Sequence, residues 1–158
     1  MKKIKNIGLL LFLILSTLSF SYQVNYDDVV DIVLRNYPQS RVTKIEIANY
    51  KGKTVYEGET FNKGQKIEFI IDVNTGEVYK MDPNYDDEYN PSYNLPITFE
   101  QASRIALDNS FNGRVKSIEL KNIDKKAYYT VEVKEDKSEK EINIDANSGK
   151  ILNIKESM

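Results

Sequence analysis

Asp72 and Asp145 lie 73 residues apart, and each begins the same pattern, Asp-x-Asn-x-Gly. Two carboxylates can work as a general acid and a general base, so this pair is the first candidate for catalysis. Each aspartate can instead order its own turn by accepting hydrogen bonds from nearby backbone amides. A turn is needed twice, whereas an active site is usually needed once. We therefore interpret Asp72 with Gly76, and Asp145 with Gly149, as structural turns.

Composition limits the other chemistry that this sequence could perform. The 158 residues include no histidine and no cysteine. This excludes Ser-His-Asp and Cys-His catalysis, disulfides, lipid-bearing cysteines and imidazole zinc sites. Ser103 and Ser110 have lysines in the sequence around them, but not at a spacing typical of a Ser-Lys dyad. We predict that the chain is not an enzyme, with no catalytic residue and no cofactor.

Four acidic residues gather in one short segment, at Asp82, Asp86, Asp87 and Glu88. Such a cluster could bind calcium, but the ligand spacing of an EF-hand is absent. We interpret the cluster as a solvated acidic linker and predict no metal site.

The same segment is rich in tyrosine and proline. Tyr85, Tyr89 and Tyr93 lie within it, and it holds three of the four prolines of the chain. Tyrosine is favoured at recognition surfaces because it combines apolar area with a hydroxyl group. These three tyrosines are our candidates for binding a partner, and the alternative is that tyrosine rings cover the ends of small cores.

The elements that must position these residues occur in two copies, as an internal sequence repeat. Residues 25–83 align without a gap onto residues 98–156, with about 16 of 59 pairs identical. Each copy opens with an apolar stripe of helical spacing behind a capping box, Asn25 with Asp28 and Thr98 with Gln101. Alternating apolar residues then predict antiparallel strands. We expect an α+β fold of two tandem units, each with one helix packed on a sheet of three to four strands.

The remaining segments complete the predicted organisation. Residues 1–21 combine three lysines, an apolar run and small residues, as in a secretory signal peptide. The apolar run is shorter than the ~20 residues of a membrane-spanning helix, the alternative reading. We assign 22–81 to the first unit, 82–97 to the linker and 98–158 to the second unit. Removing the signal changes the net charge from −2 to about −5, which argues against nucleic acid or anionic membrane as partners.

The second unit resembles the PepSY domain, which is found in propeptides of M4-type metallopeptidases and in exported bacterial proteins. The resemblance rests on Tyr129-x-Val131-x-Val133 followed by Ile144-Asp145-Ala146-x-Ser148-Gly149. The first unit keeps Ile71-Asp72-x-x-Thr75-Gly76 but has Gly58 and Thr60 where the second has valines. The resemblance implies a helix packed on an antiparallel sheet, and an inhibitor or folding aid for a peptidase.

We therefore expect an exported, non-catalytic binding module that regulates or inhibits an extracytoplasmic peptidase. Because no peptidase domain follows, we expect that peptidase to be a separate protein. The partner would add a strand at a sheet edge or receive the tyrosine–proline linker in a cleft. The alternative is an envelope sensor or carrier of a small ligand or metal, favoured by the acidic linker and by a groove between the units. We expect the mature protein to be periplasmic or extracellular, without stable membrane insertion. The sequence leaves open the oligomeric state and whether the two sheets merge.

Overall fold

The computed structural model describes residues 23–84, 95–123 and 126–157. The elements follow the repeat, with one helix and four strands in each half. The first half contains α1 (Tyr26–Asn36), β1 (Arg41–Tyr50), β2 (Lys53–Asn62), β3 (Gln65–Asp72) and β4 (Val78–Asn84). The second half contains α2 (Phe99–Asp108), β5 (Arg114–Ile123), β6 (Lys126–Lys134), β7 (Glu139–Asp145) and β8 (Ile151–Ser157).

Both helices begin where the sequence predicts. Asn25 and Thr98 are the N-caps, and each forms a complete capping box with the residue three positions on. A capping box satisfies two backbone N–H groups that the first turn of a helix cannot pair. The buried face of each helix then begins with an aromatic ring, Tyr26 in α1 and Phe99 in α2.

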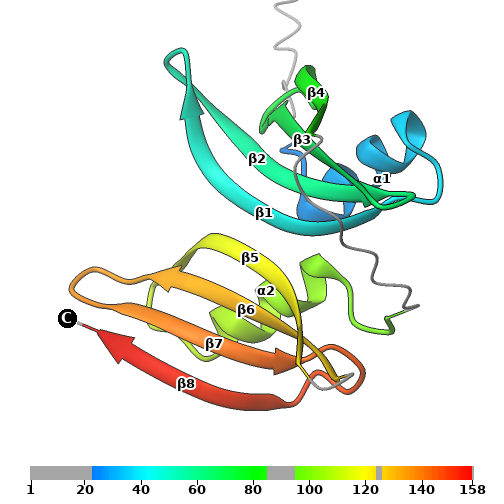
Figure 1. Cartoon of the computed structure of the whole chain (residues 1–158). Coiled ribbons are helices and arrows are strands. Elements are labelled where there is room, and N and C mark those ends of the chain that lie inside the picture. The colour runs from blue at the N-terminus through cyan, green and yellow to red at the C-terminus, as the bar shows by residue number, and fades with distance from the viewer. Residues whose placement is uncertain (1–22, 85–94, 124–125, 158) are drawn as a thin grey trace, which may run out of the picture.

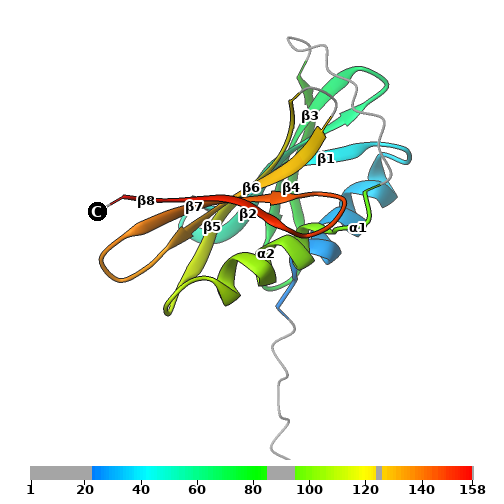
Figure 2. The same cartoon turned by 90° about the horizontal axis from the view of Figure 1, so that it is seen from below.

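The eight strands form one antiparallel sheet, in the order β4-β3-β2-β1-β5-β6-β7-β8. The expected α+β class and the helix and strands of each half are confirmed, but two separate small sheets are not. The halves join where β1 pairs with β5, and both helices cover the same face of the sheet (Figures 1 and 2). The reason is physical: β1 and β5 would otherwise each be an edge strand with unpaired backbone groups.

The junction between the halves is symmetric with respect to the repeat. Ile45 of β1 lies opposite Ile118 of β5, which is its own counterpart 73 residues later. Both side chains are fully buried and belong to a single core that runs under both helices. The repeat therefore supplies one continuous core instead of two small ones, which suits halves of about 60 residues.

A tyrosine in the second strand of each half anchors the segment before the helix. Tyr56 donates a hydrogen bond to the carbonyl of Val24, and Tyr129 donates one to the carbonyl of Ile97, each at 2.8 Å. Burial raises the pKa of both hydroxyls to about 12, so they stay protonated donors at neutral pH.

Some predicted segments lie partly or wholly outside the described residues. These are the signal peptide at 1–21 and most of the linker at 82–97; strand β4 runs through Asp82 and Pro83 to Asn84. Within the described part of the chain, neither helix has the length and apolar character needed to span a membrane.

Candidate functional site

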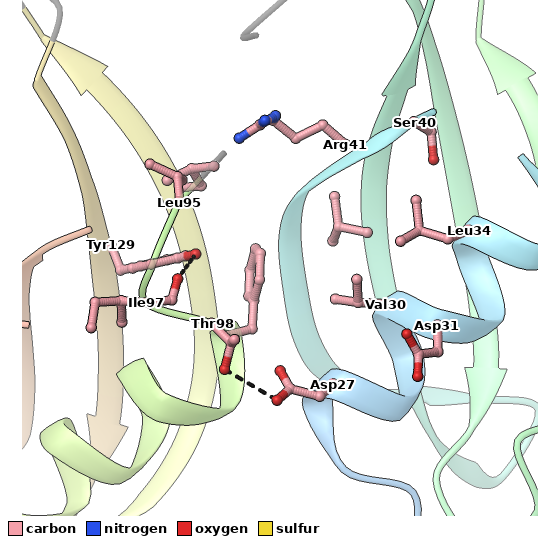
Figure 3. A pocket seen from close by; sticks show the side chains of 13 residues that line it. Asp27, Val30, Asp31, Leu34, Ser40, Arg41, Leu95, Ile97, Thr98 and Tyr129 are labelled. Carbon is pink, nitrogen blue, oxygen red and sulfur yellow. Dashed lines mark hydrogen bonds between the residues drawn. The ribbon is translucent and has the colours of Figure 1, made fainter. Parts of the chain in front are cut away.

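A groove lies between the two halves, on the face of the sheet that carries the helices (Figure 3). Its volume is about 530 Å³. It is lined by α1, β1 and the residue before β1 from the first half, and by β5, β6 and the segment entering α2 from the second. We call it the inter-unit groove; because its walls come from both halves, it exists only when the two sheets merge.

Its walls carry both apolar and polar side chains. Val30 and Leu34 project from α1, and Val42 lies at the start of β1. Val30 and Leu34 are four residues apart, so they lie on the same side of the helix. Both are only partly buried, which leaves apolar area that a bound group could cover.

The opposite wall comes from the second half. Leu95 and Ile97 precede α2, and Phe99 packs edge-on against the Tyr129 ring with 5.1 Å between ring centres. The Tyr129 hydroxyl is engaged with the Ile97 carbonyl (Figure 3). Burial raises the Tyr129 pKa, while the nearby positive charge of Arg41 partly opposes that shift. This wall is therefore shaped by packing: the two rings are buried, and the partly exposed side chains of Leu95 and Ile97 are what it offers to a partner.

One end of the groove is closed by a contact between the helices. Asp27 of α1 accepts a hydrogen bond from the Thr98 hydroxyl at 3.1 Å and another from the Glu100 backbone N–H at 3.3 Å. A carboxylate beside the first turn of a helix interacts favourably with the helix dipole. Asp27 therefore ties α1 to the N-terminus of α2.

The other end carries Arg41 and Ser40 (Figure 3). The Ser40 hydroxyl is buried and has no hydrogen-bond partner among the described residues. Asp31 lies exposed on α1 along the same rim. The groove thus offers an apolar surface flanked by a carboxylate and a guanidinium group, an arrangement that suits binding of an apolar side chain with polar neighbours.

The aspartates of the repeated pattern lie far from the groove and from each other. Asp72 accepts hydrogen bonds from the N–H groups of Asn74 and Thr75 at 2.9 and 3.0 Å, and the Tyr79 hydroxyl donates to it at 2.8 Å. Asp145 accepts the corresponding bonds from the N–H groups two and three residues later. Asp72 ends β3 and Asp145 ends β7, and these strands are five strand spacings apart, or roughly 24 Å.

The glycines of these turns have φ angles of +70° at Gly76 and +72° at Gly149, a conformation that glycine adopts readily. A Cβ atom at Gly76 would lie 3.1 Å from Ile32, and one at Gly149 would lie 3.2 Å from Ile105. Each turn therefore packs closely against the helix of its own half.

Ser103 and Ser110 do not line the groove. The hydroxyls of Ser103 and Ser110 donate to carbonyls of their own helix, Glu100 and Ala106. Tyr85, Tyr89, Tyr93 and three of the four clustered acids lie outside the described residues. Within the described ranges, no group of three acidic side chains is arranged to hold a metal ion.

Comparison with known proteins gives a consistent family match. The family described as "Peptidase propeptide and YPEB domain", PepSY, matches twice, at residues 23–82 and 96–155. No curated protein matches the sequence significantly.

Two solved structures are similar. A Clostridium difficile 630 protein, described as a lipoprotein, superposes with a TM-score of 0.62 at 25% identity, covering 85% of this chain and 94% of that one. The Bacillus megaterium YpeB C-terminal domain gives a TM-score of 0.35 at 14% identity, covering 85% of this chain and 66% of that one.

Proposed function

This chain belongs to the PepSY family, and from that premise we propose that it is an exported, non-catalytic module that binds and regulates an extracytoplasmic peptidase. The family supports the link to a peptidase because its description names peptidase propeptides. The structural relative described as a lipoprotein, and the signal-like residues 1–21, support a place outside the cytoplasm.

The observation that carries the proposal is the inter-unit groove. Its polar side chains Asp27 and Tyr129 are engaged in bonds that hold the two halves in shape. What remains for a partner is the partly exposed apolar surface of Val30 and Leu34 on one wall, with Asp31, Ser40 and Arg41 beside it. A partly exposed apolar groove that is already shaped favours binding of a projecting side chain with little reorganisation.

The test uses one variant in the groove and its counterpart in the repeat. Leu34→Arg places a charge in the groove, whereas Leu107→Arg makes the same change at the equivalent position of α2, which does not line the groove. Both leucines are partly exposed, so both variants should fold, and circular dichroism checks this.

The purified proteins are immobilised and incubated with the envelope fraction of the source cells. We expect the natural protein and Leu107→Arg to retain a peptidase and to change its rate of substrate cleavage, and Leu34→Arg to lose at least tenfold in retention. Recovery of no peptidase, together with unchanged envelope proteolysis after deletion of the gene, would overturn the proposal.

A second candidate is a sensor or carrier of a small ligand. The groove volume of about 530 Å³ favours it, because sites for small molecules commonly measure ~300–1,000 Å³. Thermal melting with millimolar CaCl2, and separately with leucine-containing dipeptides, tests the metal and the apolar ligand. A rise in melting temperature that Leu34→Arg abolishes would favour this function, and no shift with either probe removes it.

A further inference from the structure

The two outer strands of the sheet occupy equivalent positions in the repeat, yet only one of them is protected against pairing with another chain. Edge strands present unpaired backbone groups, and natural proteins block them with prolines, charges or covering side chains. In β4, Pro83 lacks an N–H group and the Tyr37 hydroxyl donates to the Met81 carbonyl at 3.4 Å. The Tyr79 hydroxyl is held by both Asp72 and Lys53.

Strand β8 lacks each of these features at the position 73 residues later. Pro83 is replaced by Glu156, which keeps its N–H group, and Tyr79 is replaced by Leu152. Tyr37 is replaced by Ser110, whose hydroxyl bonds within α2 instead of reaching the edge strand. Every residue of β8 is exposed.

The apolar residues of β8 form a strip along this edge. Ile151 and Ile154 pair with Ile144 and Ile142, which are fully buried in the core that includes α2. A bulge places both Ile151 and Leu152 opposite Ile144. Leu152 and Ile154, two residues apart, therefore point to the helix-bearing face, and their exposed fractions are 57% and 42%.

The charged residues of β8 leave this strip accessible. Lys155 forms an ion pair with Glu141 of the neighbouring strand at 2.9 Å, so its ammonium group is directed across the sheet. Glu156 lies opposite Lys140 in the strand register. The ammonium group of Lys140 is directed to Glu135 instead, at 2.9 Å.

We infer that β8 pairs antiparallel with β8 of a second copy of this chain, about a twofold axis through Asn153. In that register Leu152 lies opposite Ile154 of the second copy, and the reverse pair repeats the contact. Lys150, immediately before β8, then lies opposite Glu156 of the second copy, so opposite charges meet at both ends. This self-complementarity in charge and apolar character favours a second copy as the occupant.

The pairing has a clear structural consequence. A twofold axis perpendicular to the sheet keeps the helix-bearing face of both copies on the same side. The dimer therefore has a continuous sixteen-stranded sheet with both inter-unit grooves facing one way. A single strand pair is a small interface, so we expect a dimer that forms at high micromolar protein concentrations.

The absence of cysteine makes the register directly testable. Asn153→Cys introduces a single thiol that lies opposite its own copy. Opposed residues of antiparallel strands have Cα atoms ~4.5–5.5 Å apart, which suits a disulfide. Lys80→Cys makes the matched change at the equivalent position of β4. We expect mild oxidation to crosslink Asn153→Cys at least tenfold faster than Lys80→Cys.

Charge exchange provides the second arm of the test, read by sedimentation equilibrium. Glu156→Lys should weaken the dimer at least tenfold, and adding Lys150→Glu should restore it to within threefold of the natural protein. A protein that stays monomeric at several hundred micromolar would overturn the inference. Equal crosslinking of the two cysteine variants would also overturn it. So would a dimer that Glu156→Lys does not weaken. Peptidase binding through the groove is measured separately with Leu34→Arg, so either idea can fail alone.

Discussion

Gly58 of β2 lies opposite Phe69 of β3, and the phenyl ring fills the space where a side chain on Gly58 would stand. In the second half the equivalent pair is Val131 and Ile142, so a small and a large residue replace two of middle size. The total volume is distributed differently while the strand pairing is kept. This explains how β2 remains a regular strand although it departs from the pattern of the second half.

We expect Gly58→Val to lower the free energy of unfolding by about 3 kcal/mol, because the new side chain would overlap both the Phe69 ring and the Lys44 carbonyl oxygen. Adding Phe69→Ile recreates the pair of the second half and removes the ring overlap. Urea unfolding should show that the double variant recovers part of the loss. A double variant less stable than Gly58→Val alone would contradict this account.

Thr60, also in β2, should be replaceable by valine with a gain in stability. Its hydroxyl is buried and has no partner among the described residues, and Val133 occupies the equivalent position in β6. Removing an unsatisfied buried hydroxyl should raise the free energy of unfolding by about 1 kcal/mol. Thr130→Val is the matched control, because the Thr130 hydroxyl bonds to Asn143 at 2.9 Å and its loss should lower stability. Equal effects of the two substitutions would show that hydrogen bonding does not decide the outcome.

Much of each half could be predicted from the sequence because its signals are local. The capping boxes at Asn25 and Thr98 and the alternation of apolar residues each depend on neighbours within one element. The junction of β1 with β5 has no such signal. Ile45 would be apolar whether its strand were an edge or paired, since it also faces the helices.

The inter-unit groove could not be predicted in detail for the same reason. Val30 and Leu34 have the helical spacing of core residues, and the sequence gives no reason to separate them from the rest of the stripe. They line a groove only because the pairing of β1 with β5 fixes the distance between α1 and the second half. The sequence did contain one relevant feature, the tyrosine repeated at positions 56 and 129. Each of these tyrosines anchors the segment before the helix of its half.

Acid should destabilise the protein in part through Asp72. Hydrogen bonds lower the Asp72 pKa to about 2. The bond from the Tyr79 hydroxyl has the largest effect, and the bonds from the Asn74 and Thr75 amides add to it. An aspartate in the unfolded chain has a pKa of ~3.9. Because the folded pKa is lower, this stabilisation is present above about pH 4 and is lost as pH falls toward 2.

Thermal melting of the natural protein and of Asp72→Asn between pH 7 and pH 2 measures this contribution. We expect the variant to be less stable at pH 7 and to lose less stability below pH 4. Tyr79→Phe keeps the backbone hydrogen bonds and should show an intermediate dependence. Parallel melting curves for all three proteins would assign the acid sensitivity to other groups.

Asp27 should mainly stabilise the packing of the two halves against each other, and contribute less to the local structure of either helix. Its carboxylate joins α1 to Thr98 and Glu100 at the start of α2, while the capping box of α2 is completed by Gln101 without it. We expect Asp27→Ala to lower the free energy of unfolding by about 1.5–3 kcal/mol, as for other hydrogen bonds to a charged group. Asp31→Ala removes a carboxylate from the same helix and the same groove, but from an exposed position, and should change stability by less than about 0.5 kcal/mol. Native-state hydrogen exchange should also show faster exchange in the first turn of α2 for Asp27→Ala alone, because its Glu100 N–H loses its acceptor. Equal exchange in the two variants would mean that β1–β5 pairing and the shared core hold the halves together without this contact.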